Sequence, residues 1–188
     1  MTQPTTALLL IDVQASFPAR DYWVESLAQL WRPQQRALLD AAQANDIPVV
    51  RILHEAPGSQ GAFDPNNGLI RPLDGFEDTA AVTFNKRAHN AFTDTSLEAW
   101  LREHGVERLA ISGIRTEQCC ETTARVGSDL GFRVDFISDA TLTFPMTRHG
   151  VTWSADAIKA RTELVLEDRF ARIISTQEMI DEWQTPRE

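Results

Sequence analysis

The sequence predicts an α/β fold: a single Rossmann-like domain over residues 1–188, with a mainly parallel sheet of about six strands and helices on both faces. Short apolar runs alternate with helix-like stretches along most of the chain. The first run, ALLLI at residues 7–11, is continuously apolar, which is typical of a strand buried on both faces of a parallel sheet. A chain of 188 residues can bury a substantial core, and no repeat or linker divides it.

Each expected element has a local signal. Strands are expected where apolar and β-branched residues gather, at residues 7–11, 48–53, 80–84, 108–114, 132–137 and 171–174. Helices are expected over 27–44, which Pro33 starts or interrupts, over 97–104, 121–129 and 154–168, and after Thr176, which caps a short terminal helix. Asp94 or Thr95 can cap the second helix, and Gly105 ends it. Residues 55–79 are rich in Gly, Pro and Asn, which predicts a long loop or lid, often a functional element.

Composition excludes several classes of protein. Eighteen Lys and Arg against 27 Asp and Glu give a net charge of −9, which argues against nucleic acid and membrane surfaces as partners. No apolar run approaches the ~20 residues of a membrane helix, and the N-terminus lacks the basic start of a secretory signal. Cys119 and Cys120 are adjacent and cannot join distant segments, so nothing indicates an oxidising compartment. We expect a cytoplasmic protein.

Three reactive side chains lie just beyond expected strands. Asp12 follows the first strand, Lys86 lies two residues after the third, and Cys119 lies five residues after the fourth. Because ligands of parallel sheets bind beyond the carboxyl ends of the strands, near the switch point in strand order, these groups are expected to share one site. An acid, an amine and a thiol are the groups that covalent catalysis by cysteine uses. Taken singly, each has an ordinary alternative: a helix cap, a solvated lysine and a buried thiol.

The two cysteines are expected to have different roles. Cys120, Thr123, Ala124 and Gly127 are small residues at helical spacing, which predicts that Cys120 packs in the core. Cys119 is then the exposed thiol. In the first turn of the helix it would face free backbone N–H groups, which lower a thiol pKa and favour the thiolate.

A series of short motifs runs from about residue 7 to residue 175. They are residues 8–17 (LLLIDVQASF), Lys86 with residues 90–92 (NAF) and 95–97 (TSL), residues 113–119 (GIRTEQC), and residues 131–134 (GFRV) before 139–140 (DA). In these motifs the chain resembles the isochorismatase-like cysteine hydrolases.

The resemblance implies a catalytic triad of Asp12, Lys86 and Cys119. It also implies a non-proline cis peptide at Ile114–Arg115 and an oxyanion hole formed by the backbone N–H groups of Arg115 and Cys119. Members of the family assemble as dimers or tetramers, so a homodimer or homotetramer acting on a small molecule is expected, with neighbouring subunits sometimes closing the pocket.

Two departures from the family pattern matter. Cys120 stands where many members have an apolar residue after the nucleophile. The nicotinamidase branch carries an Asp-x-His metal motif after its second strand, whereas this chain has RILHE at residues 51–55. One His beside one Glu is a poor site for a divalent ion, so we expect no metal and no other cofactor, and nicotinamidase activity is disfavoured.

The hypothesis is a hydrolase that acts on a non-peptide C–N bond of a small amide or carbamoyl substrate, through a thioester on Cys119. One alternative is vinyl-ether hydrolysis of the isochorismatase type, which needs an acid and water but no nucleophile. A second is a non-catalytic redox or binding protein that uses the Cys119–Cys120 pair, although a vicinal disulfide is strained.

The wall of the site is less defined by the sequence. Phe17, His54 and Phe144 are candidates for substrate binding, because they lie at or beyond expected strand ends. His54 can equally be a structural hydrogen-bonding residue, and Trp23 is expected in the core under the loop. Arg115 could bind a substrate carboxylate, although a surface salt bridge is the favoured interpretation. The pattern gives no role for His149 or Trp153, which fall in a loop before the helix expected at 154–168.

Overall fold

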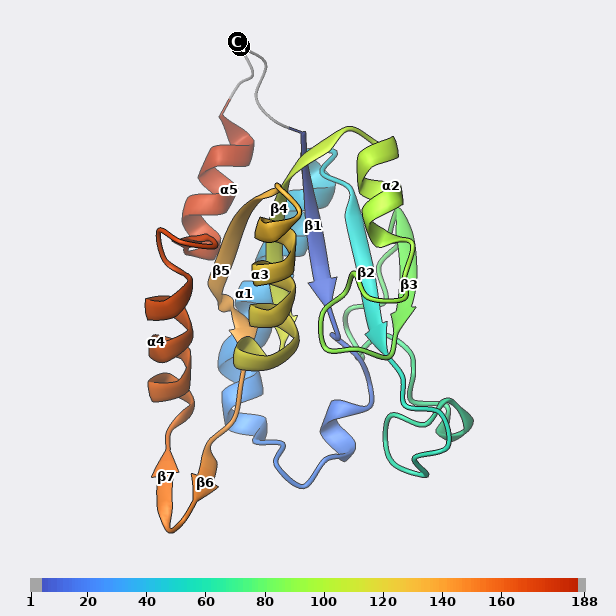
Figure 1. The fold of residues 1–188 in the computed structure, drawn as a ribbon, viewed down its shortest axis with the longest axis vertical. Coiled ribbons are helices and arrows are strands. Elements are labelled where there is room, and N and C mark those ends of the chain that lie inside the picture. Colours follow the sequence, from blue (N-terminus) through green and yellow to red (C-terminus); the bar gives the residue numbers. More distant parts are fainter. Residues whose placement is uncertain (1–4, 186–188) are drawn as a thin grey trace.

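A computed structural model describes residues 5–185 and contains the expected parallel sheet. Six strands, all parallel to their neighbours, form it in the order β3-β2-β1-β4-β5-β8 (Figure 1). Their bounds are β1 Thr5–Ile11, β2 Val49–His54, β3 Val82–Lys86, β4 Val106–Ile114, β5 Arg133–Leu142 and β8 Arg172–Ile174. The predicted fold class is therefore confirmed, with β1 and β4 side by side where the strand order reverses.

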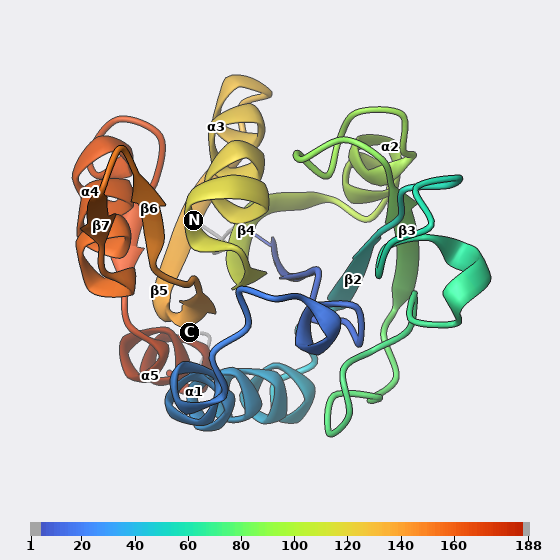
Figure 2. The same cartoon turned by 90° about the horizontal axis from the view of Figure 1, so that it is seen from below.

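Helices cover both faces of the sheet (Figure 2). One face packs against α1 (Glu25–Ala44) and α5 (Thr176–Gln184), and the other against α2 (Leu97–Glu103), α3 (Glu121–Asp129) and α4 (Ala155–Leu166). Single turns of helix lie at Phe17–Ala19, Pro65–Asn67 and Thr116–Cys120. None of the helices within residues 5–185 is both long and apolar enough to cross a bilayer.

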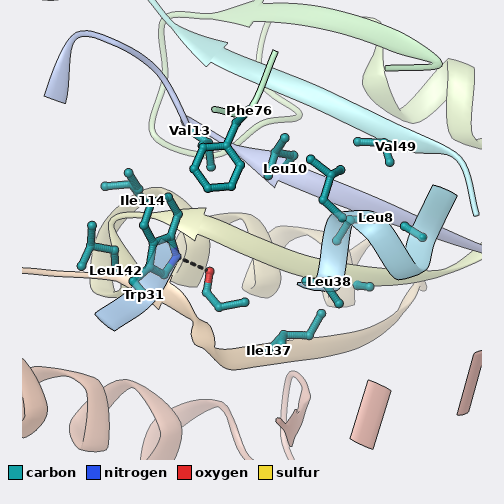
Figure 3. Packing of buried hydrophobic residues seen from close by; sticks show 14 of the residues in the cluster. Leu8, Leu10, Val13, Trp31, Leu38, Val49, Phe76, Ile114, Ile137 and Leu142 are labelled. Atoms are coloured by element: carbon teal, nitrogen blue, oxygen red, sulfur yellow. Dashed lines mark hydrogen bonds between the residues drawn. The ribbon is translucent and has the colours of Figure 1, made fainter. Parts of the chain in front are cut away.

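The continuous apolar run of β1 supplies both halves of the core. Leu8 and Leu10 point into the cluster under α1, and Leu9 and Ile11 into the cluster on the opposite face, because successive side chains of a strand alternate. All four side chains are fully buried. In the first cluster Trp31 of α1 lies beside Ile114 and Leu142, and its Nε1 donates a hydrogen bond to the Ala140 carbonyl at 2.8 Å (Figure 3).

Several element ends differ from expectation. β3 runs to Lys86, so Lys86 closes the strand rather than following it. The N-caps are Ser96 for α2 and Ser175 for α5, in place of the expected Asp94 or Thr95 and Thr176. Ser175 forms a capping box with Glu178, a pattern that the SxxE spacing of the sequence does contain.

Pro33 neither starts nor interrupts α1. It lies inside the helix on the exposed side, and so does Gln29, the residue whose carbonyl loses its helical donor. Water can bond that carbonyl, which reduces the usual cost of an internal proline.

A short antiparallel hairpin of β6 (Met146–Arg148) and β7 (Val151–Trp153) lies where a loop was expected. Figure 1 shows it projecting past the carboxyl ends of the sheet strands. His149 and Gly150 form its two-residue turn, and both have positive φ (50° and 75°). Such turns favour Asn-Gly or Asp-Gly, so His149-Gly150 is a weak sequence signal for the hairpin that it forms.

Gly113 in β4 is required by the contact with β1. Its φ is +124°, and a Cβ built there would lie 1.9 Å from the Ile11 carbonyl oxygen. We expect Gly113→Ala to lower the free energy of unfolding by at least about 3 kcal/mol, because neither backbone can move without breaking the sheet. Denaturant unfolding measures this.

Gly131→Ala is the matched control. Gly131 also has a positive φ, +88°, but a Cβ there meets nothing within 4 Å. Only the conformational cost of about 1 kcal/mol remains. Equal losses for the two variants would contradict the steric explanation.

Candidate active site

The three predicted groups meet at one point. The Lys86 Nζ lies 2.9 Å from Asp12 Oδ2 and 3.3 Å from Cys119 Sγ. They come from the residue after β1, the last residue of β3 and the helical turn that follows β4. The prediction that these residues share the carboxyl edge of the sheet is confirmed.

Local backbone geometry fixes Asp12 in this position. Its φ is +51°, in the left-handed region, which Asp tolerates better than most residues because its short side chain can bond locally. The Asp12 N–H donates a hydrogen bond to the Ile52 carbonyl at 2.9 Å, extending the pairing of β1 with β2 by one residue. The turn then directs the carboxylate across the strand ends toward Lys86.

Cys119 lies in a wide helical turn ahead of α3. Residues Thr116–Cys120 form a π-helix, with the Cys120 N–H bonded to the Arg115 carbonyl at 3.2 Å, and π turns are frequent at functional sites. Cys120 is fully buried, as predicted for the core. The prediction of an exposed Cys119 thiol is wrong, because only 7% of the residue is accessible.

The expected low pKa of the Cys119 thiol is also wrong. Burial and the negative charge of Asp12 raise this pKa far above its ordinary value, and the charge of Lys86 lowers it by less. For Lys86, burial opposes the charged form, but Asp12 and Cys119 outweigh it and the net pKa is raised. The resting site therefore holds a neutral thiol beside a charged ammonium.

Donors and acceptors at the site are unequally satisfied. Besides its contacts with Asp12 and Cys119, the Lys86 Nζ donates to the Ala88 carbonyl at 3.1 Å and lies 3.3 Å from His54 Nδ1. The second oxygen of Asp12, Oδ1, is buried and has no hydrogen-bond partner among residues 5–185. A buried carboxylate oxygen without a donor is an available proton acceptor.

Arg115 differs from the expected surface salt bridge. Its guanidinium is buried, 3.0 Å from Glu117 Oε1, and lies 4.8 Å from the Tyr22 ring centroid and 5.8 Å from that of Phe144. Neither Arg115 Nη2 nor Glu117 Oε1 has hydrogen-bond geometry, so this contact is an ion pair by proximity rather than an aligned bond. The Ile114–Arg115 peptide is cis, as the family resemblance implied.

The aromatic candidates lie in two groups. Phe17 and His54 both meet Phe63, with ring centroids 5.2 and 5.4 Å apart, so the long loop over residues 55–79 covers this side of the site. Phe144 is fully buried against Tyr22 and Trp23, at 5.6 and 5.3 Å.

Sequence reasoning missed two of these rings. Tyr22 and Phe63 carried no periodic signal, since they lie in irregular segments. Each borders a predicted site residue only because the chain folds back on itself.

Within residues 5–185, no group of three or more His, Cys, Asp or Glu is arranged to hold a metal ion. The imidazole Nδ1 of His54 faces the ammonium of Lys86 instead.

Two cavities flank the outer helices rather than the three central groups. One of about 410 Å³ includes Glu117 and Trp153 in its wall, and one of about 320 Å³ includes Lys159 and Ser175. Trp153, which the sequence left without a role, is thus a half-exposed wall of the first cavity. His149 is a turn residue at the tip of the β6–β7 hairpin.

Comparisons with known proteins agree on one family. The model of the isochorismatase domain matches residues 6–178. Nicotinamidase 3 from Arabidopsis thaliana is 32% identical over 162 residues, which cover 78% of this chain and 77% of the relative. Streptothricin hydrolase from Streptomyces noursei is 33% identical over 142 residues, 73% of this chain and 50% of the relative. A crystal structure of a protein from Burkholderia xenovorans LB400, assigned as an isochorismatase, superposes with a TM-score of 0.88 at 30% identity and covers 100% of this chain and 92% of its own.

The electrostatics of the thiol can be tested by its reactivity. Asp12→Asn removes a charge that raises the Cys119 pKa and leaves Lys86, so we expect Cys119 to react with iodoacetamide about tenfold faster near pH 7.5. Lys86→Met removes the charge that lowers the pKa and should slow the reaction. Mass spectrometry of the peptide that contains residues 119–120 gives the rates.

The exposed Asp129→Asn is the control and should react like the unmodified protein. Slower alkylation in Asp12→Asn would contradict the assigned sign of the Asp12 effect.

Proposed function

This chain belongs to the isochorismatase family, and on that basis we propose that it is a cysteine hydrolase that cleaves a C–N bond of a small amide or carbamoyl compound through a thioester. The observation that carries the proposal is the contact of the Lys86 ammonium with both Asp12 and Cys119. The nicotinamidase and streptothricin hydrolase relatives support the reaction class, hydrolysis of C–N or related bonds.

In the first step Asp12 takes the proton of the Cys119 thiol and the sulfur attacks the carbonyl carbon of the substrate. The carbonyl π electrons move to oxygen, which we place at the backbone N–H groups of Arg115 and Cys119. Collapse of this tetrahedral intermediate breaks the C–N bond, and the proton held by Asp12 passes to the departing nitrogen. The products of this half-reaction are an amine or ammonia and an acyl thioester on Cys119.

In the second half-reaction water attacks the thioester carbon while Asp12 takes a proton from the water. The C–S bond then breaks, the acid leaves, and the proton returns to sulfur. Atoms and charges balance over the cycle, with one water consumed for each C–N bond.

The neutral resting thiol fits this sequence. As the proton moves from sulfur to Asp12, one negative charge moves from the carboxylate to the sulfur. Both positions lie within 3.3 Å of the Lys86 ammonium, so the charge stays paired throughout. A cation that is already in place stabilises the negative charge both on the carboxylate and on the sulfur, so the site does not have to rearrange.

We assign Phe17, His54 and Phe144 to the border of the substrate site. Phe144 contacts Arg115 on one side, and Phe17 with His54 contacts the 55–79 loop on the other. The small-molecule substrate would lie between these groups and the sulfur, within a homodimer or homotetramer.

Because the chain matches the isochorismatase domain, vinyl-ether hydrolysis is a second candidate. That reaction needs no thiol. The buried contact between Cys119 and Lys86 would then have no chemical use, so C–N cleavage accounts for more of the site.

Replacing the nucleophile tests the proposal. We expect Cys119→Ser to retain the fold and to lose at least about 1,000-fold in turnover, since an alcohol is a far weaker nucleophile in a site built for a thiol. The assay is ammonia release from a panel of small primary amides and N-carbamoyl compounds, with mass spectrometry to trap an acyl group on the peptide with residues 119–120.

Cys120→Ala is the matched control, because it deletes only the adjacent core thiol and should keep turnover within a few-fold. Full ammonia release by Cys119→Ser would rule out the thioester route through this sulfur.

A further inference from the structure

We propose that His54 is a positioning residue, whose Nδ1 accepts one N–H of Lys86 while Cys119 is neutral and yields that N–H to the sulfur when the thiolate forms. The catalytic role of His54 rests on the proposed function. Its contact with Lys86, and the measurements that test this contact, concern the protein without substrate.

The Lys86 ammonium has more hydrogen-bond acceptors around it than it has N–H donors. The side chain of Lys86 is fully buried, and an ammonium carries three N–H donors. Four acceptors surround it: Asp12 Oδ2 at 2.9 Å, the Ala88 carbonyl at 3.1 Å, and His54 Nδ1 and Cys119 Sγ, both at 3.3 Å. Two donors go to the shorter oxygen contacts, so His54 and Cys119 share the third.

The acceptor strength of sulfur decides where that third N–H points. A neutral thiol is a weak acceptor and an imidazole nitrogen is a good one, so the N–H favours His54 in the resting site. A thiolate is charged and attracts the N–H more strongly than a neutral imidazole does. His54 thus keeps the buried ammonium satisfied at those stages of the cycle when sulfur carries no charge.

The position of His54 is fixed by its backbone. Gln14, itself fully buried, accepts the His54 N–H at 2.6 Å and donates its Nε2 to the His54 carbonyl at 3.0 Å. His54 is also the strand partner of Lys86 in the β2–β3 register. These backbone contacts therefore hold the His54 imidazole beside the Lys86 ammonium, and they involve neither the substrate nor the 55–79 loop.

The charges facing His54 favour the neutral ring. Burial and the positive charge of Lys86 lower the His54 pKa, and so does His89, whose ring stacks at 6.3 Å, while Asp12 and a hydrogen bond with the Ala88 backbone act in the opposite direction. Cys119 shares Lys86 with His54 and is neutral at rest. Since Lys86 has only donors to offer, Nδ1 carries the lone pair and the ring proton lies on Nε2.

Two variants at this position separate the possible roles. His54→Asn keeps a non-titrating acceptor close to the place of Nδ1, and His54→Leu keeps similar bulk without an acceptor. In His54→Leu the third N–H of Lys86 can bond only to sulfur, which favours the thiolate. We expect the rate of Cys119 alkylation by iodoacetamide near pH 7.5 to rise about tenfold in His54→Leu and to stay within about twofold in His54→Asn.

Turnover gives the second readout. In the tetrahedral intermediate the sulfur is bonded to carbon and uncharged, so in His54→Leu a buried N–H of Lys86 lacks a good acceptor there, and kcat should fall about tenfold while KM stays within about threefold. His54→Asn should restore most of kcat. A large rise in KM in both variants would make His54 a substrate ligand instead, and alkylation and kcat unchanged in His54→Leu would overturn the proposal.

A measurement on the unmodified protein keeps the inference testable if His54→Leu does not fold. Long-range ¹H–¹⁵N NMR near pH 7 should show His54 as the neutral Nε2–H tautomer, and a protonated Nδ1 would overturn the proposal. Neither the tautomer nor the alkylation rate requires turnover, so an active Cys119→Ser would contradict the proposed function and leave the role of His54 to be decided separately.

Discussion

The ion pair between Lys86 and Asp12 is the interaction on which the rest of the site depends. Both side chains are essentially inaccessible to water, and an unpaired charge at such a depth costs several kcal/mol. In the sheet β2 lies between β1 and β3, and the Lys86 side chain reaches from the end of β3 to Asp12 beyond β1. The third group, the Cys119 sulfur, lies in the turn that follows β4. This strand approaches β1 closely because Gly113 has no side chain to meet Ile11.

Burial also changes how the thiol must work. A thiol on an exposed helix end can ionise at rest, whereas Cys119 has a raised pKa because burial and Asp12 oppose its charged form. The site compensates by holding base, cation and thiol in contact, so that ionisation can accompany attack on the substrate. His54 and Gln14 then extend the arrangement from three groups to five, all of which lie at or just beyond the ends of sheet strands.

The fold and the three central residues could be predicted because they follow from simple patterns. The unbroken apolar run of β1 is typical of a strand buried on two faces, and reactive residues placed after parallel strands lie at one edge of the sheet. The exposure of Cys119 could not be predicted in this way, because it depends on side chains from other segments that close over the sulfur. The hairpin after β5 was missed since its turn lacks Asn-Gly, and a surface salt bridge was expected for Arg115 because the sequence alone cannot tell a buried ion pair from a solvated one.

A double-mutant cycle on the free energy of unfolding tests the central claim most directly. The four proteins are the unmodified chain, Asp12→Asn, Lys86→Met and the double variant. If the two charges stabilise each other in a dry site, the double variant should be at least about 2 kcal/mol more stable than the sum of the single losses predicts. Losses that add to within about 0.5 kcal/mol would show that Lys86 and Asp12 do not interact, which would contradict this description of the site.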